Sequence, residues 1–125
     1  MSIQGMNHFN VLTDNVEATR RFYVDVIGLT EGERPPLGFD GAWLYAGGRA
    51  ILHVSAAKLP ADRKGVIDHM AFSAAGLKGT VAKLQGLGIE HVVRQQVGSG
   101  IWQVFLHDPM GAKVELDFDP AEAAP

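Results

Sequence analysis

The chain has 125 residues, of which 46% are hydrophobic and 20% charged, with a formal net charge of -3 and a pI near 5.9. This size and composition predict a single globular domain over residues 1–125, and the weak acidic charge argues against nucleic acid as a partner. Because there is no cysteine, disulfides and sulfur-ligated metals are excluded. No apolar window has the length of a signal peptide core or a membrane span, so we expect a cytoplasmic protein with no membrane partner.

The first part of the chain predicts the order strand, helix, strand, strand, strand. The expected elements are a strand at 5–12, a helix at 16–27, a short strand at 29–34 and a hairpin at 41–55. Thr13 or Asp14 is the expected N-cap of the helix, and Gly28 is its expected stop. The hairpin turns at Gly47 and Gly48, which readily adopt a positive φ.

The second part repeats this order after an aperiodic loop at 56–65. The expected elements are a strand at 66–74, a helix at 76–88 and strands at 89–97, 101–108 and 112–118, followed by a frayed tail at 120–125. The helix carries Leu77, Val81 and Leu84 at helical spacing. The last two strands are joined by the turn residues 108–111.

The two parts align with an offset of 61 residues. His8 then matches His69, and with one further inserted residue His53 matches Glu115. The repeat predicts an α+β fold of two βαβββ modules, at about 5–55 and 66–119, which bury their helix-facing strand surfaces separately.

Those four residues are candidate metal ligands. Each lies on the expected strand face that points away from the helix, because side chains alternate along a strand. If the four strands are neighbours or face each other across a cup, their side chains converge. Imidazoles with one carboxylate suit a divalent Fe, Zn, Ni, Mn or Co ion, and two histidines with one carboxylate leave positions open on non-haem iron.

The paired modules resemble the vicinal oxygen chelate superfamily. The resemblance covers about residues 5–119, and its most specific local motif is the DPMG turn, residues 108–111, followed by VEL, residues 114–116. The superfamily contains glyoxalase I, extradiol dioxygenases, methylmalonyl-CoA epimerase, fosfomycin-resistance proteins and the metal-free bleomycin-resistance proteins. It implies an incompletely closed, cup-shaped barrel of eight strands with the helices outside, commonly assembled as a homodimer.

The resemblance also implies roles for the four candidates. His8, His69 and Glu115 correspond to the recurrent metal ligands of the superfamily, whereas His53 stands where glyoxalase I usually has glutamate. Glu115 and His53 are therefore also candidate catalytic residues, His53 as a ligand or as a base. The implied activity is that of a metal-dependent lyase, isomerase or dioxygenase whose small-molecule substrate chelates the metal through adjacent oxygens.

Other side chains are expected to surround the substrate. The candidates for a pocket wall are Asn10, Trp43, Tyr45, Gln103 and Phe105. His91 and His107 fit an ordinary strand residue and a turn-flanking residue, and we do not expect them to bind metal. The alternative function is a non-catalytic binding or resistance protein of the bleomycin-resistance type. The intact ligand set argues against this alternative.

Overall fold

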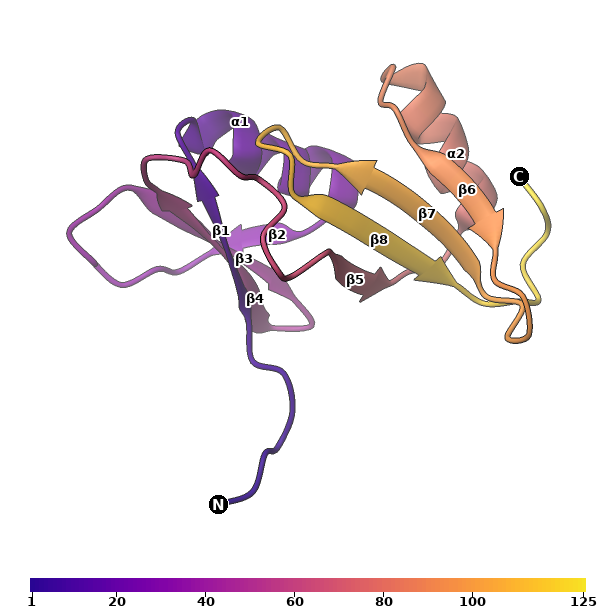
Figure 1. The fold of residues 1–125 in the computed structure, drawn as a ribbon, viewed down its shortest axis with the longest axis horizontal. Coiled ribbons are helices and arrows are strands. Elements are labelled where there is room, and N and C mark those ends of the chain that lie inside the picture. The colour runs from indigo at the N-terminus through magenta and orange to yellow at the C-terminus, as the bar shows by residue number, and fades with distance from the viewer. The chain divides into compact units, whose positions relative to one another are not determined.

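The computed structural model describes residues 1–125 and divides the chain into two compact units, Met1–Arg63 and Lys64–Pro125. The boundary falls inside the predicted loop at 56–65. Each unit contains its own four-stranded sheet and helical segment (Figure 1). This arrangement confirms the predicted α+β class and the two βαβββ modules. No helix has both the length and the apolar character needed to cross a membrane.

The first unit has strand order β1-β4-β3-β2, with β1 parallel to β4 and the other pairs antiparallel. Its elements are β1 (Phe9–Thr13), α1 (Val16–Arg21), the π-helix η1 (Phe22–Ile27), β2 (Thr30–Gly32), β3 (Gly41–Ala46) and β4 (Arg49–Ala56). Gly47 and Gly48 form the turn between β3 and β4 with φ of 56° and 74°. The hairpin prediction is therefore confirmed, and its turn needs the positive φ that glycine supplies.

The first helical segment differs from the prediction at its start and in its second half. Its N-cap is Asn15, whose side chain accepts a hydrogen bond from the Ala18 amide, so neither Thr13 nor Asp14 caps the helix. Thr13 instead accepts a hydrogen bond from the Asn15 amide at 2.9 Å, because its side chain points into the core. After Arg21 the segment continues as a π-helix, and it ends at Gly28 in the left-handed conformation, as predicted.

The second unit has strand order β5-β8-β7-β6, again with a single parallel pair, β5 with β8. Its elements are β5 (Met70–Ser73), α2 (Leu77–Gly86), β6 (Val92–Gln95), β7 (Trp102–His107) and β8 (Lys113–Phe118). Asp108 shapes the turn between β7 and β8, since its carboxylate accepts hydrogen bonds from the amides of Met110 and Ala112. This turn is the one predicted from residues 108–111.

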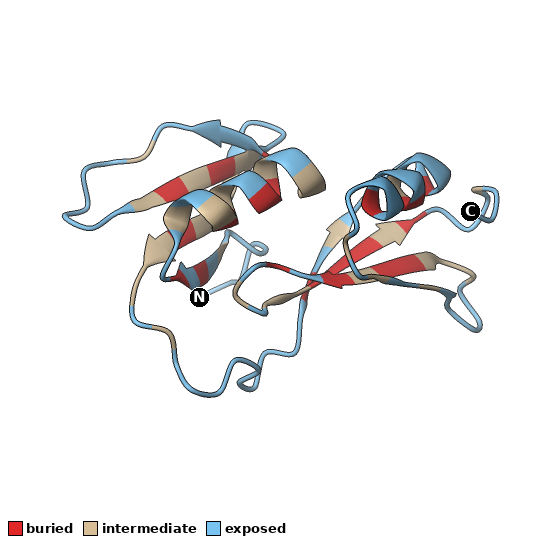
Figure 2. Ribbon diagram, turned by 90° about the horizontal axis from the view of Figure 1, so that it is seen from above, coloured by how far each residue is buried: buried red, intermediate tan, exposed pale blue.

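The core of each unit lies between the sheet and the helical segment. Leu52, Val54 and Leu44 are buried in the first unit, and Val104, Val114 and Phe118 in the second. Figure 2 shows buried positions in the strands and helical segments of both units and exposed residues in the long connections. The buried strand positions alternate with positions on the opposite face of each sheet, which we call the open face.

The two sheets have equivalent registers. Asn10 pairs with His53 in the first unit, and Ala71 pairs with Glu115 in the second. Each central strand residue has an aromatic partner on its other side: Trp43 beside His53, and Phe105 beside Glu115. The offsets read from the sequence are therefore structural equivalences. One detail differs, because β1 and β5 each begin one residue after the histidine that was predicted to lie inside the strand.

Candidate metal and substrate site

A histidine and a carboxylate meet on the open face of the second unit. The Nε2 atom of His69 lies 2.8 Å from Oε2 of Glu115. The other ring nitrogen of His69, Nδ1, lies 2.8 Å from Oδ2 of Asp68. Because both contacts are made to acidic oxygens, the imidazole is held between two carboxyl groups, and its ring plane is fixed from both sides.

The contacts continue from Glu115 along the strands. The side-chain amide of Gln103 donates a hydrogen bond to Oε1 of Glu115, and its carbonyl accepts one from Nε of Arg94 at 3.0 Å. These two bonds define which end of the Gln103 amide faces the carboxylate. A continuous chain of contacts thus runs from Asp68 through His69, Glu115 and Gln103 to Arg94.

Burial shapes the protonation of Glu115. Only 4% of this residue is exposed. Burial, and then a hydrogen bond and charge repulsion from Asp117, raise the pKa of Glu115, whereas Gln103 and His69 act to lower it. Asp117 is two residues away on the same face of β8, and its Oδ1 is buried without a hydrogen-bond partner. The carboxyl groups of Glu115 and Asp117 therefore lie close together without enough neighbouring positive charge to balance both of them when they are ionised.

The two predicted ligands of the first unit form a stack of rings. The imidazoles of His8 and His53 lie with centroids 3.9 Å apart and planes 15° apart. The other face of His53 stacks on Trp43, with centroids 4.1 Å apart. Burial and then the neighbouring His8 lower the pKa of His53. His53 is therefore held as a neutral ring between His8 and Trp43 over a wider range of pH than a free histidine.

The structure thus brings the four predicted ligands together as two pairs, one in each unit. Neither unit by itself gathers three or more histidine or carboxylate side chains that could hold a metal ion.

All five predicted pocket residues lie on open faces. Asn10 accepts a hydrogen bond from the Ser55 hydroxyl at 2.7 Å, beside His53 in the neighbouring strand. Tyr45 packs its ring against Gly32 and donates its hydroxyl to the Glu33 carbonyl at 2.6 Å. The remaining three are Trp43, Gln103 and Phe105, which contact the ligand candidates or their neighbours as described above.

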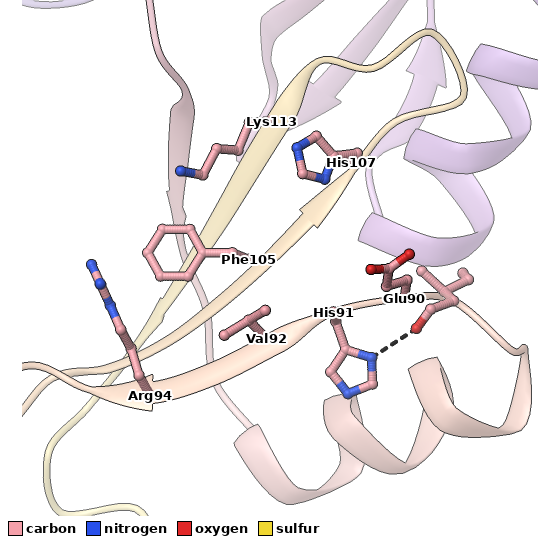
Figure 3. Close-up of a pocket in the computed structure, with 8 residues that line it drawn as sticks. Glu90, His91, Val92, Arg94, Phe105, His107 and Lys113 are labelled. Carbon is pink, nitrogen blue, oxygen red and sulfur yellow. Dashed lines mark hydrogen bonds between the residues drawn. The ribbon is translucent and has the colours of Figure 1, made fainter.

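A pocket of about 590 Å³ opens on the second unit, and it is lined by Phe105, whose ring centroid lies 6.3 Å from that of His69. Figure 3 shows Phe105 in its wall between Arg94 and Lys113. Phe105 was named from the sequence as a candidate pocket residue, but neither Arg94 nor Lys113 was singled out. The signal was nevertheless present, since Arg94 and Lys113 share the strand phase of Gln103 and Glu115.

Two histidines that were not expected to bind metal also line this pocket. His91 forms a hydrogen bond from Nδ1 to the Ile89 carbonyl at 2.7 Å, so that nitrogen must be the donor. His107 is paired with Lys113 at the end of β7.

Together these features define a class of protein with two βαβββ modules and histidine and carboxylate groups on the open faces of both sheets. The sequence model described as "Glyoxalase/Bleomycin resistance protein/Dioxygenase superfamily" matches residues 5–116. The chain belongs to this superfamily.

Individual relatives agree with this assignment. The chain is 32% identical over 127 residues to "Glyoxylase I 4" of Arabidopsis thaliana, covering 93% of this chain and 71% of the relative. A glyoxalase family protein from Bacillus anthracis has a similar structure, with a TM-score of 0.80 and 24% identity over 95% of this chain and 98% of that one.

A fosfomycin resistance protein, FosX of Listeria monocytogenes, also shares the fold. The TM-score is 0.77 and the identity 15%, with 94% of each chain covered. That structure, of a single-residue mutant, is described as a complex with Mn(II) and 1S,2S-dihydroxypropylphosphonic acid. At these identities the structural matches establish the fold of the present chain.

Proposed function

We propose that the protein is a metal-dependent enzyme of the glyoxalase or dioxygenase type. Its substrate would be a small molecule that binds a divalent metal through two adjacent oxygens. The proposed ligands are His8, His69 and Glu115, with His53 as a fourth ligand or as a base. The contact between His69 and Glu115 is the observation that carries the proposal.

The donor atoms of the second unit fit a metal ion. Nε2 of His69 and Oε2 of Glu115 lie 2.8 Å apart, so the fold already brings one nitrogen and one oxygen donor together. Donors of both kinds suit divalent first-row metals. A cation would also compensate the buried carboxyl of Glu115 and the unpartnered Oδ1 of Asp117.

The stack in the first unit fits less directly. Imidazole lone pairs lie in the ring plane, so the lone pairs of two stacked rings lie in two nearly parallel planes that do not meet at one ion. Ligation by both His8 and His53 would require one ring to turn. Because His53 is also stacked on Trp43, His8 is the ring with fewer contacts to lose.

The chain's own residues have definable tasks in such a site. When bound, the metal would supply a Lewis acid that stabilises negative charge on the chelated oxygens. Asp68 would hold His69 through Nδ1 and leave Nε2 for ligation, and Gln103 would fix one oxygen of Glu115. His53, kept neutral by its surroundings, would accept a proton on a free ring nitrogen.

Metal identity would decide the reaction class. Iron with oxygen consumption on catechol-like compounds would indicate the dioxygenase branch, whereas nickel, zinc, manganese or cobalt without oxygen uptake would indicate a lyase or isomerase. We further propose a homodimer, since both sheets have edge strands that a second copy can cover.

The direct test is metal analysis of protein purified without chelator. We expect about one first-row metal ion per site in the wild type and at least tenfold less in Glu115→Ala. Asp25→Ala, which removes an exposed carboxylate from η1, should keep the wild-type content. Negligible metal in all three proteins would refute the proposal.

The second candidate function is binding without turnover. It is favoured by the pocket of about 590 Å³, whose wall is complete within one unit and contains neither His69 nor Glu115. A metabolite that binds with unchanged affinity after chelator treatment, and that the metal-loaded protein leaves intact, would support this candidate over the enzyme.

A further inference from the structure

The pocket of the second unit has a cationic wall. Arg94, Lys113 and the ring of Phe105 form this wall, and Glu90 is the only acidic residue that lines the pocket. Glu90 is four residues from Arg94, which is roughly 13 Å along an extended chain. In Figure 3, Glu90 lies on the side of His107, away from the Arg94 guanidinium. The end of the pocket beside Arg94 therefore carries positive charge without a carboxylate.

Arg94 is held in position but retains unused donors. Its Nε donates to Gln103 at 3.0 Å, and its guanidinium carbon lies 4.7 Å from the centroid of the Phe105 ring. Neither contact uses the two Nη groups, which have no hydrogen-bond acceptor in the structure. A planar guanidinium that is already oriented loses little entropy when its remaining N–H groups bind two oxygens of one anion.

Lys113 adds a second charge to the same wall. Its Nζ lies 5.1 Å from the centroid of Phe105. Its Nζ also forms an ion pair with Oδ2 of Asp68 at 3.4 Å, and an ammonium group has three N–H donors, so donors remain for a ligand. Phe105 on β7 thus lies between the two cations, Arg94 from β6 and Lys113 from β8, and its ring contacts both of them.

We propose that Arg94 and Lys113 form a subsite for an anionic group of the substrate, a carboxylate or a phosphonate or phosphate. Arg94 binds the group with both Nη donors, and Lys113 contributes charge from β8, on the other side of β7. The proposed function places the chelated oxygens of the substrate at His69 and Glu115. The inference rests on that proposed function, because only an enzyme would make the bound anion part of a substrate.

The strand register sets the anion and the chelated oxygens apart. Phe105 is the direct neighbour of Glu115 in the sheet, and its ring centroid lies 6.3 Å from that of His69. Arg94 and Glu115 are both bonded to Gln103. A ligand that contacts both Arg94 and the His69–Glu115 pair therefore bridges about the length of the Gln103 side chain. Such a ligand is a small molecule whose acidic group lies a few atoms from its chelating oxygens.

The test is calorimetric titration of chelator-treated full-length protein at low salt with benzoate, phenylphosphonate and neutral benzamide. We expect both anions to bind roughly ten- to hundredfold more tightly than benzamide. The preferred anion identifies the carboxylate or the phosphorus oxyanion as the natural group. Arg94→Met should abolish the preference for anions, and Arg94→Lys should retain part of it because the charge stays while the paired donors are lost.

Lys78→Met is the matched control, because it removes one positive charge from exposed helix α2 of the same unit. It should leave all three affinities unchanged. Benzamide binding as tightly as benzoate, an anion preference that survives in Arg94→Met, or no anion binding below about 10 mM would each overturn the subsite. Since no metal is present in the titration, the metal analysis of Glu115→Ala can fail or succeed independently.

Discussion

Replacing Gln103 by leucine probes the support of Glu115 most directly. Gln103 is 6% exposed, and leucine approximates its volume while removing both hydrogen bonds. Glu115 then loses the donor on Oε1, and Arg94 loses the acceptor of its Nε. A hydrogen bond to a buried charged group contributes about 1.5–3 kcal/mol, so in metal-free protein we expect the free energy of unfolding to fall by about 2 kcal/mol near neutral pH.

The effect should depend on pH in a defined direction. The pKa of Glu115 is raised by burial and then by Asp117, so its favourable contribution is complete below the unfolded value of 4.5 and is lost as pH rises through the folded pKa. Gln103 opposes this shift, and its removal raises the pKa of Glu115 further. As pH increases, the free energy of unfolding of Gln103→Leu should therefore fall more than that of the wild type. At about pH 4 the difference between the two free energies of unfolding should shrink to roughly 1 kcal/mol.

Urea-induced unfolding of chelator-treated protein at about pH 4 and about pH 7.5 measures both quantities. Gln103→Leu on a Glu115→Gln background is the control, because the charged acceptor is absent and the pH dependence of the difference should vanish. A loss of less than about 0.5 kcal/mol near neutral pH, or an equal loss at both pH values, would refute the assigned role of Gln103.

Two further predictions concern the frame of each unit. Gly32→Ala should destabilise the protein by about 1–3 kcal/mol in thermal or urea unfolding, since the new Cβ would lie 2.6 Å from Cε2 of Tyr45. Gly79→Ala has open space around the new methyl group and should instead stabilise helix α2 by about 0.5–1 kcal/mol. Equal effects of the two substitutions would contradict the packing described. Glu122→Ala should cost about 1 kcal/mol, because the Glu122 carboxylate accepts hydrogen bonds from the Gly76 and Leu77 amides at the start of α2; an unchanged unfolding midpoint would argue against this cap.

The fold was predictable from the sequence because each module repeats the same local signals. Alternation in the strands, the apolar stripe Leu77, Val81 and Leu84, and the turn glycines each indicated the element that the structure contains. The π-helical continuation was not predictable, since a stripe with Tyr23 and Ile27 at helical spacing gives no sign of the extra residue per turn. The true N-cap was missed because Thr13, Asp14 and Asn15 are all good capping residues, and the sequence does not show that Thr13 is buried in the core.

The pairing of candidate site residues followed from the repeat, but their contacts did not. Sequence periodicity placed His69 and Glu115 on the open face, whereas the roles of Asp68, Gln103 and Arg94 depend on rotamers and cross-strand neighbours. The stack of His53 between His8 and Trp43 was equally invisible, because periodicity assigns a face and leaves ring orientation open. The predicted ligand set stays a prediction that metal analysis will test.

The equal registers of the two sheets bear on how such a chain can change its chemistry. His53 and Glu115 occupy equivalent positions in the two four-stranded sheets, and each is paired with an aromatic residue on the adjacent strand. An exchange of the side chain at either position changes the charge and basicity of the open face and leaves the backbone pairing of the strands in place. A duplicated module of this kind lets one half keep its side chain at this position while the other half changes, because the two sheets do not share backbone hydrogen bonds.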